Sequence, residues 1–90
     1  MEASTVTVRY WASARAAAGV AADDLPVDGP VTLAELRERA AALHPDTRLE
    51  AVLGVCSVLV GERPVATRDP ATVMVGPGET VEFLPPFAGG

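Results

Sequence analysis

The sequence has no lysine, only one cysteine and no long apolar run. All seven basic residues of the 90-residue chain are arginine, so the chain offers no lysine as an acceptor for isopeptide attachment. Cys56 is the sole cysteine, which excludes an internal disulfide and leads us to expect a reducing, cytoplasmic environment. No apolar run approaches the roughly 20 residues that span a bilayer. The first residues also lack a signal-peptide pattern.

Positive charge and catalytic motifs are scarce as well. Twelve acidic residues give a net charge of -5, which argues against nucleic acid and anionic membranes as partners. One histidine and one cysteine without close spacing do not make a zinc site. The stretch Gly76-Pro77-Gly78 lacks the lysine, the hydroxyl residue and the spacing of phosphate-binding loops. We therefore expect no metal site, no bound cofactor and no catalytic site within the chain itself.

The remaining reactive side chains have simple structural explanations. His44 stands before a proline at the end of a predicted helix, where it favours the helix dipole. Cys56 lies in the apolar run 55–60, which predicts a buried and inert thiol within a strand. Asp23 and Asp24 are expected on a solvated hairpin edge rather than at a metal.

Apolar residues, in contrast, are plentiful enough for one hydrophobic core. They make up 49% of the chain, and 90 residues suffice for a single domain. Neither an internal repeat nor a linker interrupts the sequence. We expect a folded domain over residues 1–84, followed by an extended tail over residues 85–90.

Alternation of apolar and polar residues predicts strands at both ends of the domain. Residues 5–11 place Val6, Val8 and Tyr10 on one face, and residues 80–84 do the same with Val81 and Phe83. Gly76 to Glu79 predicts a type II turn before the last strand. Weaker strands are predicted over residues 20–27, with Pro26 marking an edge, and over 55–60, 65–66 and 73–75.

One well-defined helix is predicted in the middle of the chain. Thr32 and Glu35 form a capping box, and Pro45 ends the helix near His44. Apolar residues recur at helical spacing and are expected to face inward: Leu33, Leu36, Ala40 and Leu43. Short helical turns are predicted over residues 12–18, closed by Gly19, and over 49–53.

This order of elements predicts an α+β fold of the ubiquitin-like β-grasp type. A single main helix can cover only one face of a mixed sheet. The first and last strands would then be parallel neighbours, which places Trp11 and Leu84 on the helix-free face. An exposed apolar pair beside the start of the tail indicates a docking surface.

The tail is the feature most suggestive of function. Gly89 and Gly90 end the chain without side chains, so this end can enter a channel too narrow for other residues. Six residues beyond Leu84 reach about 20 Å when extended. Pro85 and Pro86 favour an extended path, which reduces the entropy lost on insertion. We interpret the terminal carboxylate as the working group of the protein.

A carboxylate at neutral pH is a poor electrophile and must be activated before it reacts. The simplest activation is a mixed anhydride with AMP, and the chain has no ATP site. A partner enzyme would therefore supply ATP and catalysis. The acyl-adenylate could then take sulfur to become a thiocarboxylate, or pass to an amine or a thiol.

The ending, residues 78–90, resembles the sulfur-carrier family of ubiquitin-like proteins, the MoaD/ThiS-like proteins. It is most similar to the small subunits of molybdopterin synthase. These typically end on a Gly-Asp/Glu turn, an apolar strand, Pro-Pro, two variable residues and Gly-Gly. The run 6–18, with Arg15, is also similar. The departures are a longer N-terminus and a longer stretch over residues 71–78, which leave the register of the minor strands open.

The resemblance implies a sulfur-donating role. Gly90 would be adenylated by an E1-like (MoeB-like) enzyme that uses ATP, and a sulfur donor enzyme would supply the sulfur of a C-terminal thiocarboxylate. The large, MoaE-like synthase subunit would then take the tail into its active site. Gly89, which has no side chain, would let the tail pass through a narrow channel. There the sulfur would pass to cyclic pyranopterin monophosphate in molybdenum cofactor biosynthesis. The implied partner-binding residues are Trp11, Leu84, Pro85, Pro86, Phe87 and Ala88.

Other functions remain open from the sequence. The sulfur could serve thiamine thiazole, cysteine or tRNA thiolation, although thiazole carriers are usually shorter and often lack Pro-Pro. The protein could instead be a ubiquitin-like modifier joined to protein lysines. It could also be a plain β-grasp interaction module whose terminal glycines are incidental.

Overall fold

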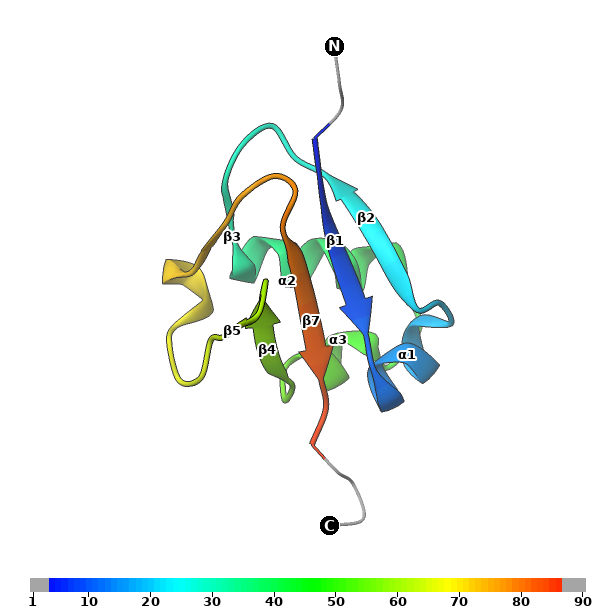
Figure 1. Cartoon of the computed structure of the whole chain (residues 1–90). Coiled ribbons are helices and arrows are strands. Elements are labelled where there is room, and N and C mark those ends of the chain that lie inside the picture. Colours follow the sequence, from blue (N-terminus) through cyan, green and yellow to red (C-terminus); the bar gives the residue numbers. More distant parts are fainter. Residues whose placement is uncertain (1–3, 87–90) are drawn as a thin grey trace.

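A computed structural model describes residues 4–86 of the chain. Figure 1 shows a sheet with helices packed on one side. The elements in chain order are β1 (Thr5–Tyr10), α1 (Ala12–Ala18), β2 (Ala22–Pro26), β3 (Val31–Thr32), α2 (Leu33–Leu43), α3 (Leu49–Leu53), β4 (Ser57–Val60), β5 (Arg63–Pro64), the 3-10 turn η1 (Pro70–Thr72), β6 (Met74–Val75) and β7 (Thr80–Leu84). Within the described residues, no helix combines the length and apolar character needed to cross a membrane.

The main sheet has five strands in the order β2-β1-β7-β4-β5. Strands β1 and β7 are parallel neighbours, with Val8 opposite Val81 and Tyr10 opposite Phe83. The other pairs in this sheet are antiparallel. Helix α2 runs across one face of the sheet (Figure 1). This arrangement confirms the predicted α+β, ubiquitin-like β-grasp fold, and Pro26 lies on an edge strand as predicted.

The core lies between the sheet and the helices, and the predicted alternation fills it. Val6, Val8 and Tyr10 of β1 are at most 2% exposed, and Val81 and Phe83 of β7 are fully buried. The helices contribute the opposite layer of the core, with Leu33, Leu36 and Ala40 from α2 and Leu49 and Leu53 from α3.

Local signals fix the helix ends and the turn before β7. Gly19 closes α1 in the left-handed region with φ of 79°, where glycine avoids the steric penalty of a Cβ. Thr32 Oγ1 accepts a hydrogen bond from the Glu35 amide at 3.1 Å, which is one half of the capping box. In the turn of residues 76–79, Gly78 has φ of 87° and the Glu79 amide donates to the Gly76 carbonyl at 3.2 Å. These values agree with the predicted type II turn.

The fourth strand begins later than predicted. Residues 55–60 were expected to form it, but β4 starts at Ser57 and Val55 is 64% exposed. The amides of Val55 and Cys56 donate to the carbonyls of Val52 and Leu53, so these residues complete the turn that ends α3. Cys56 therefore lies before the strand and not inside it.

Two further expectations are wrong. Leu43 was predicted to face inward, yet it is 51% exposed because α2 ends there and the His44 ring takes the inward position beside Tyr10. The strand paired with β4 is Arg63–Pro64 rather than 65–66, and only Val65 of the predicted segment bonds to β4, through its amide to the Val58 carbonyl at 2.9 Å. Ala66 has φ of 56°, which is incompatible with an extended strand.

Candidate functional site

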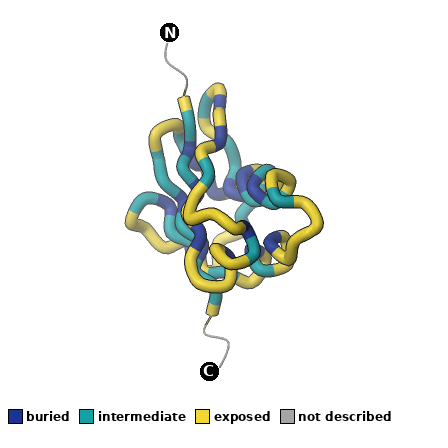
Figure 2. Tube along the Cα trace, turned by 90° about the vertical axis from the view of Figure 1, so that its right-hand side faces the viewer, coloured by how far each residue is buried: buried dark blue, intermediate teal, exposed yellow. Residues whose placement is uncertain are grey.

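The start of the tail is held by the central strand of the sheet. Strand β7 pairs with β1 on one side and β4 on the other, and Leu84 still lies opposite Ser57. Pro85 and Pro86 then leave the sheet at one end of the molecule, and Pro86 is exposed (Figure 1). The described chain begins at the opposite end (Figure 2). A strand paired on both sides gives the tail a fixed point of departure.

Four of the predicted site residues lie outside the described residues. These are Phe87, Ala88, Gly89 and Gly90. Their roles in anchoring, channel passage and activation stay predictions. The structure instead defines the surface from which they extend.

On the helix-free face of the sheet, one aromatic and two charged side chains lie together next to the start of the tail. Trp11 is 40% exposed, and its indole Nε1–H donates to Glu82 Oε1 at 3.0 Å. The Arg9 guanidinium lies 5.0 Å from the centre of the Trp11 ring, a cation–π distance. Arg9 is also directly opposite Glu82 in the β1–β7 pair. The three side chains together form what we call the Trp11 surface.

The Trp11 surface is more polar than the sequence analysis expected. The sequence predicts an exposed apolar pair of Trp11 and Leu84. Leu84 is only partly exposed, and it shares the face of Glu82 because alternate strand residues point the same way. Sequence reasoning missed the contributions of Arg9 and Glu82. Both side chains contact the indole, so a partner would meet an aromatic ring flanked by two charged groups.

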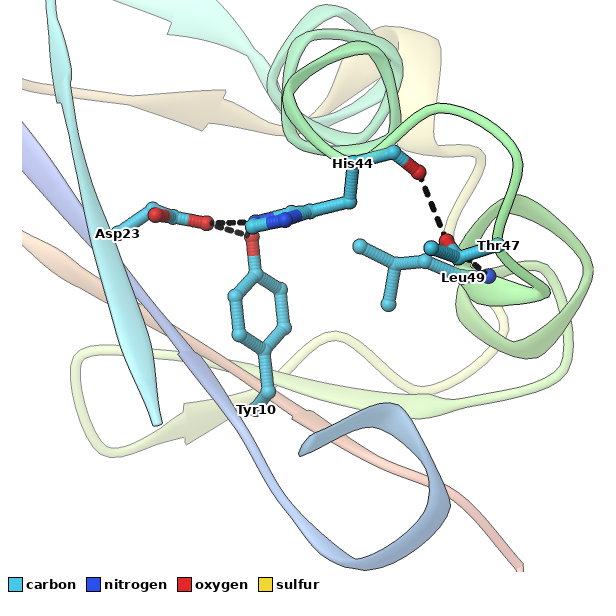
Figure 3. A network of polar contacts seen from close by, with 5 residues as sticks. All are labelled: Tyr10, Asp23, His44, Thr47 and Leu49. Atoms are coloured by element: carbon cyan, nitrogen blue, oxygen red, sulfur yellow. Dashed lines mark hydrogen bonds and ion pairs between the residues drawn. The ribbon is translucent and has the colours of Figure 1, made fainter. Parts of the chain in front are cut away.

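A second polar cluster joins β1, β2 and the end of α2 (Figure 3). The Tyr10 hydroxyl donates to Asp23 Oδ2 at 2.8 Å, and His44 Nε2 lies 2.6 Å from the same oxygen. The Tyr10 and His44 rings meet edge to face at 6.1 Å. Thr47 Oγ1 donates to the His44 carbonyl at 2.7 Å and accepts from the Leu49 amide at 3.2 Å.

This cluster corrects two expectations. Asp23 is not simply a solvated edge residue, and His44 does more than favour the helix dipole. Both are largely covered, with side chains 20% and 16% exposed. Within residues 4–86, no group of three or more acidic, histidine or cysteine side chains could hold a metal. We interpret the cluster as a structural link between the sheet and α2.

The Tyr10 hydroxyl should make stability fall at alkaline pH. Burial first, then the hydrogen bond to Asp23 and its negative charge, raise the pKa of Tyr10 well above its ordinary value near 10. Below pH 10 both the folded and unfolded states keep the proton, so this stabilisation is complete. Above pH 10 the unfolded state ionises first, and the free energy of unfolding should fall by about 1 kcal/mol per pH unit.

This prediction can be measured directly because Tyr10 is the only tyrosine. Urea unfolding between pH 8 and 11 gives the stability, and tyrosinate absorbance gives the ionisation of the folded state. Tyr10→Phe should reduce the slope above pH 10 and leave the part that comes from Cys56, whose pKa burial raises to about 11. The substitution should cost about 1 kcal/mol at neutral pH through the lost hydrogen bond. A Tyr10 that ionises at its ordinary pKa in the folded protein would contradict the expectation.

Cys56 is expected to react slowly. The sequence predicts an inert thiol within a strand, whereas Cys56 lies before β4 in the structure. Its Sγ–H donates to the Val52 carbonyl at 3.2 Å, and burial raises the pKa of the Cys56 thiol to about 11. At pH 8 the thiolate should be scarce, so alkylation by iodoacetamide should be at least about a hundred-fold slower than in the urea-unfolded chain. Equal rates in the two states would show an accessible, unperturbed thiol.

Comparison with known proteins places the chain in a family. The sequence profile described as the ThiS family matches residues 8–90. The chain belongs to the ThiS family. As a ThiS-family protein it is a sulfur carrier of the ThiS/MoaD type. It is 31% identical over 87 residues to the molybdopterin synthase sulfur carrier subunit of Aspergillus niger, covering 97% of this chain and 96% of that protein.

Solved structures agree with the β-grasp fold of this ThiS-family protein. The crystal structure of SAMP1 from Haloferax volcanii matches with a TM-score of 0.78 at 20% identity, over 96% of this chain and 99% of that one. The small archaeal modifier protein 1 (SAMP1) of Methanosarcina acetivorans matches with a TM-score of 0.75 at 17% identity, over the whole of both chains. At these identities the likeness concerns the fold alone.

Proposed function

We propose that this protein is the sulfur carrier subunit of a molybdopterin synthase and that the Gly90 carboxylate carries the sulfur. The observation that carries the proposal is the 31% identity to the Aspergillus niger subunit, which extends over nearly the full length of both proteins. The proline pair and the terminal glycines of the sequence are consistent with it.

The chemistry begins with the activation of Gly90. An E1-like enzyme joins the carboxylate to AMP from ATP and releases pyrophosphate, which converts a poor electrophile into an acyl-adenylate. The terminal sulfur of a donor-enzyme persulfide then attacks the acyl carbon and displaces AMP, which gives an acyl disulfide. A thiol reductant cleaves the S–S bond of that disulfide and leaves the thiocarboxylate. The carrier contributes the terminal carboxylate and the docking surface, while its partners contribute the catalytic groups.

The structure supports this division of work. The start of the tail is fixed by the central strand β7, so docking of the body determines where the tail begins. The Trp11 surface lies on the same strand pair and is available for contact. We propose that the activating enzyme and the large synthase subunit use this surface in turn. The large subunit then takes up the tail, and there the thiocarboxylate passes its sulfur to cyclic pyranopterin monophosphate.

A reconstituted synthase tests the proposal. Thiocarboxylated protein, the cognate large subunit and cyclic pyranopterin monophosphate should together yield molybdopterin, and the carrier should return to its carboxylate form. Trp11 is the only tryptophan, so its emission should shift when the large subunit covers it. Failure with a large subunit that is active with another carrier would contradict the proposal. Transfer to a thiazole, cysteine or tRNA acceptor would identify one of the other sulfur pathways, and adducts to protein lysines would identify a modifier.

A further inference from the structure

Two adjoining surface hollows lie beside the β4–β5 hairpin. One, of about 330 Å³, lies between α2, the end of α3 and the loop of residues 65–70. The other, of about 250 Å³, lies between β4, β5, η1 and β6. They share Val65 and Arg68, so they form one continuous depression. Three arginines border it, and we call it the basic cleft: Arg37, Arg63 and Arg68.

The basic cleft is exceptional in a chain that is acidic overall. No aspartate or glutamate lines either hollow, whereas the rest of the chain carries four arginines against twelve acids. Within the part of the chain that the structure describes, Arg37 and Arg68 form no ion pair. Arg63 has a single long contact of 3.5 Å with Glu79, and its own side chain is 79% exposed. The lining of the cleft therefore carries an excess of positive charge.

Acidic residues near the cleft form no ion pair with Arg37 or Arg68 within the described residues. The Asp69 carboxylate, next to Arg68 in sequence, accepts a hydrogen bond from the Ala71 amide at 2.9 Å and caps η1. A third hollow adjoins the cleft, since it shares Arg37 and Gly54 with the larger one, and it includes Glu38 and Glu50. Arg37 lies within ion-pair distance of neither glutamate. Among residues 4–86, both arginines thus lack an ionic partner and can meet an external anion.

The loop that carries Arg68 has a defined conformation. The Val65 amide donates to the Val58 carbonyl at 2.9 Å, and the Arg68 amide donates to the Val65 carbonyl at 3.2 Å. Ala66 is held at φ of 56°, a left-handed conformation that is unfavourable for alanine and is kept only where the surroundings impose it. The larger hollow also has apolar lining residues, of which Cys56 and Val58 are partly exposed and form an apolar floor.

We propose that the basic cleft binds an acidic segment of the partner protein that receives the tail. Carboxylates of that segment would meet Arg37 and Arg68, and an apolar side chain would lie between them on the floor. Phe83 lines the cleft and is separated from Pro86 by only two residues, so a protein that holds the tail is within reach. The cleft adjoins α2 on one face of the sheet, whereas the Trp11 surface lies on the opposite, helix-free face. The partner would therefore contact both faces of the sheet. This assignment of the partner rests on the proposed function.

Charge variants test the proposal in the full-length protein. R37Q/R68Q should bind the cognate large subunit or activating enzyme about ten-fold more weakly by calorimetry at low salt, and much of this difference should disappear at high salt. R37K/R68K keeps the charge and should stay within about three-fold of the wild type. R48Q is the matched control, because Arg48 is an exposed arginine that lines neither hollow, and it should bind normally.

A peptide probe keeps this test independent of sulfur transfer. A synthetic peptide of alternating glutamate and leucine should shift the amide NMR signals around Val65 and Arg68, and a lysine–leucine peptide of the same length should not. Normal binding of both partners by R37Q/R68Q would overturn the proposal even if the wild type accepts sulfur. Equal shifts with inorganic phosphate or with a short oligonucleotide would also overturn it, because they would show a general anion site. A wild type that fails to accept sulfur but responds to the acidic peptide would refute only the proposed function.

Discussion

Deleting Gly90 is expected to abolish thiocarboxylate formation while leaving the folded body unchanged. The deletion makes Gly89 the terminal residue and draws the carboxylate back by about 3.5 Å. Group transfer depends steeply on position, so loading by the cognate activating enzyme should fall at least about a hundred-fold. Intact-mass analysis measures the loading, and thermal unfolding should give the wild-type midpoint because a chain end contributes little stability.

A glycine far from the tail provides the control for this deletion. Gly29 has open space around the position of an added Cβ, so Gly29→Ala should accept sulfur at the wild-type rate. Loading of the Gly90 deletion within about three-fold of wild type would mean that the length of the tail does not determine the reaction. A role for the terminal carboxylate as the acyl group would then be untenable.

Phe83→Ala is expected to cause the largest loss of stability, about 3–5 kcal/mol. Phe83 is fully buried and occupies the centre of the core, on the strand that pairs with both β1 and β4. Removing its ring leaves a cavity beneath the sheet. Small domains are stable by only about 5–15 kcal/mol, so the variant should be close to unfolding at room temperature. Urea denaturation followed by circular dichroism measures the change.

The neighbouring residue gives a matched comparison on the same strand. Leu84 is only partly exposed but lies on the opposite face, so Leu84→Ala should cost less than about 1 kcal/mol. Its effect should instead be on the affinity for the large subunit. A stability loss for Leu84→Ala as large as that for Phe83→Ala would place Leu84 in the core and remove it from the docking surface.

The parts of the fold that local patterns encode could be predicted from the sequence. Alternation at period two placed Val8 and Phe83 in the core, because successive strand residues face opposite sides. The Thr32 cap and the Gly78 turn were predicted because each depends on a single residue and its immediate neighbours. The terminal motif led to the right family for a similar reason, since it is contiguous in sequence.

The parts that depend on tertiary contacts could not be predicted. The cluster of Tyr10, Asp23 and His44 joins residues 13 and 21 positions apart, and no local pattern relates them. Trp11 and Glu82 are 71 residues apart and meet only because β1 and β7 are parallel neighbours. The start of β4 was wrong for a different reason. A short apolar run is compatible both with the end of a helical turn and with a strand. In the structure, the amides of Val55 and Cys56 bond to carbonyls of α3, so these two residues belong to the helical turn.

The most direct measurement is the intact mass of the protein after incubation with the activating enzyme, ATP and a sulfur donor, followed by fragmentation. We expect a gain of about 16 Da, the replacement of one oxygen by sulfur, located at Gly90. A gain of about 32 Da located at Cys56 would show a persulfide and contradict the terminal-carboxylate mechanism. An unchanged mass, with enzymes shown to be active on another carrier, would contradict sulfur carriage at Gly90 altogether.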